Sequence, residues 1–416
     1  MIDRPEGGER AVLVHVNFPA GSMQEDLVEF EDLACSAGAE IVKVIVGTRA
    51  VPEARFFIGS GKAEEIRAEV LATDAQIVIF NHALSPAQER NLEKLFKCRV
   101  LDRTGLILDI FAQRARSFEG KLQVELALLN HMATRLVRGW THLERQRGGI
   151  GMRGPGETQL ETDRRLIRGR IKYIEKKLAK VRQQREQGRR SRRRAVVPTI
   201  ALVGYTNAGK STLFNSLTGA EVYVADRLFA TLDPTLRRID LPGVGPAILA
   251  DTVGFVRHLP HDLVDAFQAT LEEVSEADLL LHIVDASDER REANIAQVNT
   301  VLSEIGAENV PQILVYNKID LCKDLNFIVD YNIDSEIKRL KLSAQEGTGI
   351  PLLQAAIVEF LGEDIVQHSL ILTPQESKLR AELYQLKAVM TEQIDDEGNS
   401  HLVVRMSKTE LKRLLD

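Results

Sequence analysis

The sequence predicts a multidomain α/β protein in which a phosphate-loop domain is accompanied by smaller domains and a projecting helical hairpin. Three observations support this fold class. Strand-like apolar runs alternate with helical stretches on both sides of a basic middle segment. Residues 204–211 form a complete G-x-x-x-x-G-K-[ST] phosphate loop directly after one of these runs. The chain of 416 residues is too long for one compact core, so about three domains are expected.

Residues 1–111 are predicted to form a small N-terminal α/β domain with a parallel sheet. Strands that alternate with helices of about 10 to 15 residues are typical of βαβ units. The expected strands are Ala11–Phe18, Glu40–Gly47, Gln76–Phe80 and Arg99–Leu101, and the expected helices are Gln24–Ala37, Lys62–Ala72 and Pro86–Phe96.

Within this domain, Ile58-Gly-Ser-Gly-Lys62 matches half of a phosphate loop. Phe56 occupies the place of the first glycine, and Ala63 replaces the serine or threonine. A turn in which Ser60 caps the following helix explains the pattern more simply. A second nucleotide site here is the less favoured alternative.

Residues 112–196 are predicted to form an antiparallel helical hairpin. Leucines at helical spacing mark the first arm, and the second arm has a heptad seam from Ile167 to Val181. The glycine-rich segment Arg147–Gly156 between the arms cannot be helical. The hairpin is therefore expected to project from the body of the protein and to end in a glycine-rich tip.

The hairpin is strongly basic. Residues 112–195 contain 23 lysines and arginines against eight acidic residues, although the whole chain has a net charge of −6. Arg145, Arg147 and Arg153 belong to the tip, and no acidic residue occurs in 145–156. A charge run is often only a solvated helix face, but this asymmetry favours contact with the phosphates of RNA.

A nucleotide site is predicted where the strand Thr199–Val203 leads into the phosphate loop. Gly204 and Gly209 allow the backbone to curl around a β-phosphate, and the helix that begins near Lys210 adds its positive N-terminal dipole. Lys210 is expected to bridge the β- and γ-phosphates, and the Ser211 hydroxyl is expected to coordinate Mg²⁺.

An Asp-Thr-x-Gly motif at residues 251–254 is the second part of the predicted site. It follows the strand-like run Ala247–Ala250, so Asp251 is expected at the carboxyl end of a strand, near the metal. The backbone N–H of Gly254 is expected near the γ-phosphate.

The third part of the predicted site is an N-K-x-D motif at residues 317–320, which is expected to select the base of the nucleotide. Asp320 can accept hydrogen bonds from N1 and N2 of guanine, which adenine cannot reciprocate. Asn317 can contact the base edge, and the stem of Lys318 can lie along the purine ring. The strand Lys338–Leu342 leads into residues 343–345, whose N–H groups suit guanine O6.

The three motifs occur in order on alternating strands and helices, which a chance set of turns and helix caps does not explain. They predict a GTPase domain over residues 197–362. Asp251 and Asn317 each follow a predicted strand, Ala247–Ala250 and Gln312–Tyr316 respectively.

Residues 363–416 are predicted to form a small C-terminal α+β appendage. The expected elements are a strand at Ser369–Leu372, a helix at Gln375–Val389, two short strands around Asp395–Asn399 and a short helix at Thr409–Leu415.

Composition and cysteine spacing indicate the cellular compartment of the protein. No apolar run approaches the roughly 18 residues of a membrane span, and the N-terminus lacks the layout of a signal peptide. Cys35, Cys98 and Cys322 are widely spaced and form no CxxC pair, so they are expected to be buried and reduced rather than disulfide-bonded or zinc-bound. The expected location is the cytoplasm.

The sequence resembles the HflX family of translational GTPases, within the Obg–HflX branch, over nearly its whole length. The resemblance rests on four strings of residues, which are Gly204–Ser211, Phe229–Asp233, Asp251–Arg257 and Gly148–Gln159. The last string is the most specific, because generic GTPases lack it.

This resemblance implies a P-loop GTPase that binds the large ribosomal subunit and helps to split ribosomes that stall under stress. Its expected partners are that subunit with its RNA, and GTP or GDP, and the protein is expected to be a monomer. The resemblance also assigns Thr231 as the switch threonine on Mg²⁺ and the γ-phosphate. From the residues alone, Thr231 is one of three candidates, together with Thr218 and Thr235.

The expected site residues follow from the motifs and the resemblance together. The catalytic residues are Lys210, Thr231 and Gly254, and the metal ligands are Ser211 and Thr231. The GTP-binding residues are Gly204, Tyr205, Thr206, Asn207, Ala208, Gly209, Lys210, Ser211, Thr212, Phe229, Ala230, Thr231, Leu232, Asp233, Asp251, Thr252, Val253, Gly254, Asn317, Lys318, Ile319, Asp320, Ser343, Ala344 and Gln345.

Two residues bear on hydrolysis. Phe255 occupies the position where Ras-like enzymes place the glutamine that orients water, so intrinsic turnover is expected to be slow. Asn207 resembles the asparagine of GTPases that hold a monovalent cation such as K⁺ beside the phosphates, although a role in supporting the turn is equally open.

Two other classes of function remain as alternatives. One is a chaperone-like RNA-binding protein in which GTP only fixes the geometry of the domains. The other is a metabolic kinase that uses the same loop, which the N-K-x-D motif and the lack of an evident base for a small substrate disfavour.

Overall fold

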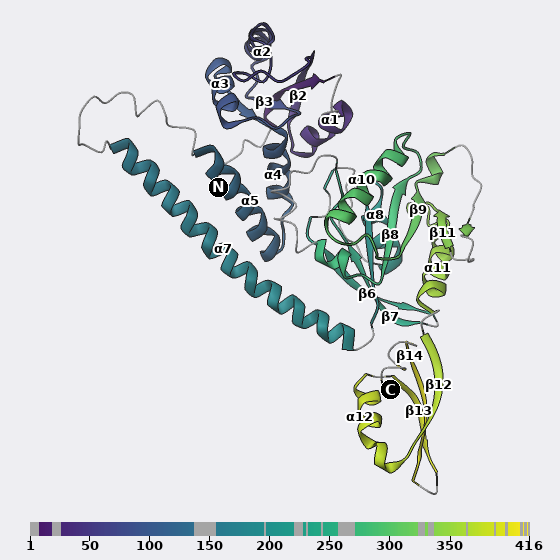
Figure 1. Cartoon of the computed structure of the whole chain (residues 1–416). Helices are drawn as coiled ribbons and strands as arrows, with labels where there is room; N and C mark the ends of the chain where they lie inside the picture. Colours follow the sequence, from purple (N-terminus) through teal and green to yellow (C-terminus); the bar gives the residue numbers. More distant parts are fainter. Residues whose placement is uncertain are drawn as a thin grey trace. The chain divides into compact units, whose positions relative to one another are not determined.

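The computed structural model describes residues 8–18, 26–136, 155–194, 197–219, 228–229, 232–242, 244–256, 271–322, 329–331, 337–362, 365–386, 388–395, 398–407, 411 and 414 (Figure 1). The chain divides into two compact units. The first comprises Met1–Lys180, Ala225–Asp233 and Val256–Gln268, and the second comprises Val181–Val224, Pro234–Phe255 and Ala269–Asp416.

A four-stranded parallel sheet forms the core of the first unit. Its strand order is β2-β1-β3-β4. Six of the eight residues of β1 are buried, and Val12, Val14 and Val16 pack with apolar residues of β3, α2 and α3. All four predicted strands and all three predicted helices are present. The elements are β1 (Arg10–Asn17), α1 (Leu27–Ser36), β2 (Glu40–Thr48), α2 (Ser60–Thr73), β3 (Ile77–Phe80), α3 (Pro86–Phe96), β4 (Arg99–Leu101) and α4 (Arg103–Arg114).

The start of α2 differs from the prediction. Gly59 is the N-cap and no side chain caps the helix, so Ser60 is the first helical residue rather than the cap. The Lys62 ammonium is 2.9 Å from a carboxylate oxygen of Glu65 on the next turn. A lysine paired in this way along a helix favours the turn interpretation over a second phosphate loop.

Helix α4 was not expected from the sequence. Its residues 106–108 and 110–111 form a nearly continuous buried apolar run, and periodicity alone cannot assign such a run to a helix rather than a strand. The side chain of Asp102 caps it by accepting a hydrogen bond from the backbone of Gly105 at 2.8 Å. The expectation of buried cysteines is wrong for Cys35, which is exposed.

Two helices, α5 (Phe118–Leu136) and α7 (Pro155–Arg194), form the arms of the predicted hairpin. Leu122 of α5 packs with Ile174 and Leu178 of α7 in a small core. Phe118, at the start of α5, lies near Lys177 of α7. Glu125, further along α5, lies near Arg170, which comes earlier in α7. The arms are therefore antiparallel.

The predicted tip residues Arg145, Arg147 and Arg153 lie outside the described residues. The expectation that the whole segment up to Gly156 is non-helical is wrong at its end, because α7 begins at Pro155. Proline suits this position, since the first N–H groups of a helix have no partner within the helix.

A seven-stranded mixed sheet forms the core of the second unit. Its strand order is β10-β11-β9-β8-β5-β7-β6, with β6 antiparallel to β7, β10 antiparallel to β11 and the other pairs parallel. The carboxyl ends of β5, β7, β9 and β11 therefore meet at one edge. The elements are β5 (Thr199–Gly204), α8 (Lys210–Thr218), β6 (Thr235–Leu241), β7 (Gly245–Asp251), β8 (Leu279–Asp285), α10 (Arg291–Glu304), β9 (Gln312–Asn317), β10 (Val329–Tyr331), β11 (Ile337–Lys341) and α11 (Ile350–Gly362).

The C-terminal part of this unit is an antiparallel sheet with the order β12-β14-β13 and one packed helix. The predicted helix 375–389 is too long. It ends at Gln385, and Val389 begins a strand that contributes to the small core. Most of the helix predicted at 409–415 lies outside the described residues. The elements are β12 (Ile365–Leu372), α12 (Ser377–Gln385), β13 (Val389–Ile394) and β14 (Ser400–Ser407).

None of the helices in the described part of the chain combines the length and the apolar character that crossing a bilayer requires.

Candidate functional site

The phosphate loop connects β5 to α8. Gly204 and Gly209 have φ angles of 150° and 91°, in the region that favours glycine. A Cβ at Gly204 would collide with the carbonyl of Ile283, and one at Gly209 would collide with the amide of Asn317. Both positions therefore require glycine, for space as well as for conformation.

The ammonium of Lys210 is buried within the loop. It donates hydrogen bonds to the carbonyls of Gly204 at 3.0 Å and Tyr205 at 2.7 Å. Burial lowers the pKa of Lys210 to about 8, an effect that nearby Asp251 opposes and Lys318 reinforces. A buried cation that donates to two carbonyls of the loop is well placed to bind an anion there.

The two residues expected near the metal are in contact. The Ser211 hydroxyl, in the first turn of α8, donates a hydrogen bond to Oδ2 of Asp251 at 2.9 Å. Asp251 ends β7 and is fully buried. The next residue, Thr252, donates from its hydroxyl to the carbonyl of Leu202 at 2.5 Å and so fixes this segment against β5.

The segment after Asp251 lies directly against the phosphate loop. The backbone N–H of Thr206 donates to the carbonyl of Phe255 at 2.8 Å, and that of Phe255 donates to Gly204 at 3.2 Å. A Cβ at Gly254 would lie only 3.1 Å from Nζ of Lys210. The structure thus brings the predicted residues Lys210 and Gly254 together.

Asn317 connects the two ends of the site. Its amide nitrogen donates to the carbonyl of Ala208 at 2.9 Å, and its amide oxygen accepts from the backbone N–H of Ala344 at 2.9 Å. Both ends of this amide are therefore bonded to protein. The geometry supports a role in joining the phosphate loop to the 343–345 loop, whereas contact with the base edge was expected from the sequence.

The base-selecting end contains an available acceptor. Oδ1 of Asp320 is buried and has no hydrogen-bond partner among the described residues. A buried carboxylate oxygen without a partner is costly unless a ligand supplies donors, as N1 and N2 of guanine would. The ammonium of the neighbouring Lys318 is 2.7 Å from Oδ2 of Asp285, a partner that the sequence motifs did not indicate.

The three candidate switch threonines are in different situations. The Thr218 hydroxyl donates to the carbonyl of Phe214 at 2.7 Å, at the end of α8. Thr235 begins β6 and stands opposite Asp251 in the sheet. Thr231 lies outside the described residues.

The remaining predicted residues are distributed over both units. Phe229, Leu232 and Asp233 belong to the first unit, whereas the phosphate loop belongs to the second. Ala230 is not among the described residues. Tyr205, Thr206, Asn207 and Ala208 lie in the phosphate loop, Thr212 in α8, Val253 after β7, Ile319 in the short helical turn after β9, and Ser343 and Gln345 after β11.

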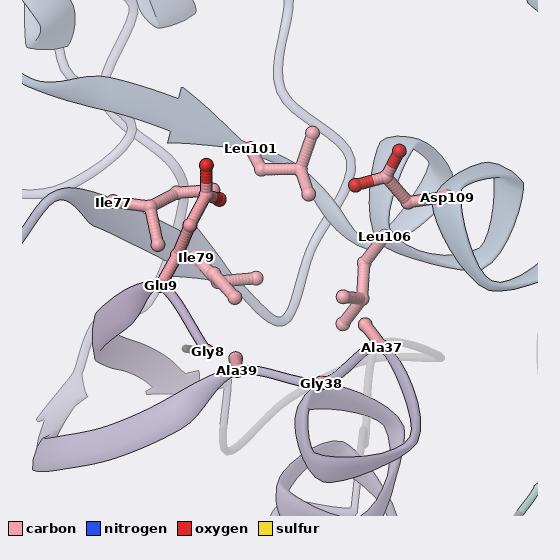
Figure 2. Close-up of a pocket in the computed structure, with 10 residues that line it drawn as sticks. All are labelled: Gly8, Glu9, Ala37, Gly38, Ala39, Ile77, Ile79, Leu101, Leu106 and Asp109. Carbon is pink, nitrogen blue, oxygen red and sulfur yellow. The ribbon is translucent and has the colours of Figure 1, made fainter. Parts of the chain in front are cut away.

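A separate small cavity occurs in the first unit, between β3, β4, α4 and the end of α1 (Figure 2). Its volume is about 80 Å³, well below the few hundred Å³ that small-molecule sites occupy. Glu9 and Asp109 line it, and none of the described residues around it is basic. This cavity is unsuited to a nucleotide.

The lowered pKa of Lys210 predicts that GTP affinity depends on pH. The phosphates of a bound nucleotide favour the charged ammonium and raise its pKa above about 8. Below this pH the lysine is already protonated, so affinity is expected to be constant there. Above it, binding must take up a proton, and the association constant is expected to fall by up to about tenfold per pH unit.

Calorimetric titration with GTP at pH 7.5 to 9, in two buffers of different ionisation enthalpy, measures both quantities. A pH-independent affinity, with no proton uptake at pH 8.5, would contradict the assignment of Lys210 as a buried lysine with a lowered pKa.

The loop with its buried lysine, the Ser211–Asp251 pair and the acceptor at Asp320 define a P-loop guanine-nucleotide-binding protein. Comparison with known families gives the particular group. The family described as GTP-binding GTPase N-terminal matches residues 24–112, GTP-binding GTPase Middle Region matches 114–192, and 50S ribosome-binding GTPase matches 199–318.

Relatives of known name match the full chain. GTPase HflX of Escherichia coli is 60% identical over 100% of this chain and 97% of its own length, and GTPase HflX of Magnetococcus marinus is 44% identical over 100% and 96%. The crystal structure of SsGBP with GDP has a TM-score of 0.48 at 26% identity, over 85% of this chain and 99% of that one. The chain belongs to the HflX family of GTPases and is a GTP hydrolase with a P-loop α/β fold.

Proposed function

We propose that this chain binds the large ribosomal subunit and its RNA, that GTP hydrolysis switches this binding, and that it splits or rescues ribosomes that stall under stress. One observation carries the proposal. The chain joins a guanine-nucleotide site to an antiparallel hairpin whose long arm, α7, has 15 lysines and arginines against five acidic residues. The description of the family that matches residues 199–318, as a 50S ribosome-binding GTPase, agrees with it.

Mg²⁺ is part of this proposal. The Ser211 hydroxyl and the Asp251 carboxylate, 2.9 Å apart and mostly buried, are the hard oxygen groups that this ion prefers. Ser211 and Thr231 would hold the ion, with Asp251 close by, and the ion would neutralise charge on the β- and γ-oxygens. The GTP-binding, catalytic and RNA-binding residues named from the sequence belong to the same proposal.

The chain's own groups then stabilise the reacting phosphate. The Lys210 ammonium exchanges its carbonyl partners for β- and γ-oxygens, and the N–H groups of the loop and of Gly254 donate to the same charge. Phe255, which is buried against the loop, cannot orient the attacking water. Intrinsic hydrolysis is therefore slow, and the ribosome supplies the missing group.

A potassium ion beside the phosphates would supply part of the missing charge. Asn207 in the loop has a φ of 60°, a conformation that asparagine tolerates and that also fits a purely supporting role. If Asn207 helps to hold K⁺, turnover is expected to be at least severalfold faster in potassium than in sodium at equal ionic strength, and Asn207→Ala is expected to remove the difference. Equal rates in the two salts would exclude the ion.

The proposal also includes a monomeric state, a cytoplasmic location and four functional segments. These segments are the N-terminal domain 1–111, the hairpin 112–196, the GTPase domain 197–362 and the C-terminal appendage 363–416. Sedimentation of the purified chain at micromolar concentration tests the oligomeric state, and a dimer would contradict it.

The main test is GTP hydrolysis measured with and without purified large subunits. Large subunits are expected to raise kcat by at least about tenfold, since a missing transition-state group supplied in trans has large effects. Small subunits alone serve as the control and are expected to have no effect. Hydrolysis that no ribosomal particle stimulates would overturn the proposal.

Two further measurements test ribosome splitting and the role of residues 145–156. Light scattering of intact ribosomes is expected to fall when the protein is added with GTP, and not with GDP, if it splits them. Removal of residues 145–156 is expected to abolish the stimulation of kcat. If stimulated turnover survives this deletion, the tip is not part of the switch, and the chaperone-like alternative gains support.

A further inference from the structure

Asp285 lies beside the N-K-x-D motif, although it belongs to none of the nucleotide-binding motifs. It is the last residue of β8, the strand between β5 and β9 in the sheet of the second unit. It stands opposite Asn317 in the parallel register, and the backbone N–H of Ala286 donates to the carbonyl of Asn317 at 2.8 Å. The sheet itself therefore fixes the position of Asp285 relative to the motif.

The two carboxylate oxygens of Asp285 have different partners. Oδ1 accepts hydrogen bonds from the backbone N–H of Ser287 at 2.9 Å and from the Ser287 hydroxyl at 2.6 Å. Oδ2 is 2.7 Å from the ammonium of Lys318. Because the contacts with Ser287 fix the orientation of the carboxylate, its second oxygen is presented to the lysine.

The ion pair with Asp285 holds the far end of the Lys318 side chain. The near end is set by the backbone, since Lys318 has a φ of 64° and precedes the short helical turn Ile319–Leu321. A lysine stem has four carbons and loses much rotational freedom when it is ordered. With both ends held, the stem is ordered before a nucleotide binds, and the entropic cost of binding is smaller.

Stability alone is a weak explanation for this pair. Its side chains are 24% and 22% exposed, and ion pairs that water reaches contribute little to the stability of a fold. The effect of the pair on the conformation of Lys318 therefore matters more than its contribution to stability.

The charge of Asp285 by itself opposes nucleotide binding. Burial lowers the pKa of Lys210, and the charge of Lys318 adds to this effect, so Lys318 acts electrostatically on the phosphate loop. Without Asp285, the positive charge of Lys318 would be uncompensated and phosphates would be attracted more strongly. A positioning role and a purely electrostatic role thus predict changes of opposite sign when Asp285 is replaced.

We propose that Asp285 is a positioning residue for the purine ring, which acts by holding the stem of Lys318 across the face of the ring. Asp320 reads the edge of the base, whereas the pair of Asp285 and Lys318 supports its face and does not distinguish one purine from another. This inference rests on the role proposed above for Lys318 in the nucleotide site.

The test measures three ligands by equilibrium competition on variants of the full chain. Asp285→Asn keeps an acceptor for Ser287 and removes the charge that holds the ammonium, and Asp285→Ala removes both. Lys318→Ala is the reference, alone and combined with Asp285→Ala. Asp288→Asn is the matched control, because it changes the charge equally three residues further on, where the carboxylate accepts from Arg290 and Asn294.

The ligands separate the face of the base from its edge and from the phosphates. GDP carries the complete base, inosine diphosphate has the same ring system without the amino group, and pyrophosphate has no base. Both Asp285 variants are expected to bind GDP about threefold to tenfold more weakly, as the cost of ordering one long side chain implies. The ratio of GDP to inosine diphosphate affinity is expected to stay constant, and pyrophosphate is expected to bind as tightly as before or more tightly.

Two further results are expected from a positioning role. In intrinsic hydrolysis, KM for GTP rises by the same factor in the Asp285 variants and kcat stays within about twofold, because the base is held equally in the ground state and the transition state. The double variant binds GDP no more weakly than Lys318→Ala alone, since Asp285 acts through that lysine. Asp288→Asn is expected to match the parent throughout.

Three outcomes would overturn the inference, and they differ from one another. GDP affinity that is unchanged or higher in Asp285→Asn would mean that only the charge matters. A loss in Asp285→Ala that persists undiminished in the Lys318→Ala background would mean that Asp285 only stabilises its turn. If Lys318→Ala itself binds GDP like the parent, the role proposed for Lys318 fails first. Retained pyrophosphate binding shows in each case that the variant is folded.

Discussion

Replacement of Asp320 by asparagine is expected to weaken GTP binding by about a hundredfold or more. The buried Oδ1 of this residue has no partner among the described residues, so guanine N1 and N2 are its natural donors. An asparagine presents one oxygen and one NH₂ group, and the NH₂ group faces a donor of guanine. A site built for paired polar readout discriminates strongly against the wrong partner because buried groups are left unpaired.

The same change is expected to improve binding of xanthosine triphosphate, whose base offers an acceptor where guanine has its amino group. Equilibrium titrations with both nucleotides measure the ratio. Asp240→Asn is the matched control, since this carboxylate lies on β6, is exposed, and forms a surface ion pair with Arg238. If the Asp320→Asn variant binds GTP as tightly as the parent, guanine is recognised by other residues.

The chemistry of the nucleotide site could be predicted from the sequence because it is local. A phosphate loop binds mainly through backbone N–H groups, so glycines at 204 and 209 are required wherever the loop occurs. The parallel strands then bring the loop, Asp251 and the 317–320 motif to one edge of the sheet. The Ser211–Asp251 contact follows from that geometry.

Contacts between distant residues could not be predicted in this way. Asp233 was expected to bind GTP, but in this structure both of its carboxylate oxygens accept hydrogen bonds from Arg116 and Ser117. Asn317 joins two loops, and Asp285 pairs with Lys318. No spacing in the sequence indicates these partners, because they depend on how whole elements pack.

The errors in element boundaries have a related cause. Residues 375–389 contain good helix formers, which favours one long helix, but Val389 packs into the C-terminal core as part of a strand. In α4, residues 106–108 and 110–111 form a short apolar run that periodicity alone cannot assign to a helix rather than a buried strand. Burial decided the outcome in both places, and burial is a property of the folded chain.

Removal of the three tip arginines is expected to give the largest effect on ribosome binding. Arg145, Arg147 and Arg153 are the basic residues of the glycine-rich segment that is predicted to form the tip, and residues 145–156 contain no acid. If they bind RNA phosphates, each neutralised phosphate releases counterions, and the logarithm of the affinity falls with the logarithm of the salt concentration. The triple change to alanine is expected to flatten this slope by roughly 0.7 to 0.9 for each phosphate that is no longer neutralised, and to weaken binding by at least about tenfold.

The matched control removes three exposed arginines of the GTPase domain, through Arg237→Ala, Arg238→Ala and Arg290→Ala in one chain. Both variants have the same net charge, so any general weakening of the attraction to RNA is the same in both. The loss of specific phosphate-binding groups affects only the tip variant. Affinity for large subunits measured from 50 to 200 mM salt separates these effects, and GTP affinity in the absence of ribosomes is expected to stay unchanged because the nucleotide site uses other residues. Equal affinities and equal slopes for the tip variant and the control would mean that the tip is a solvated turn and that the hairpin binds RNA, if at all, through its arms.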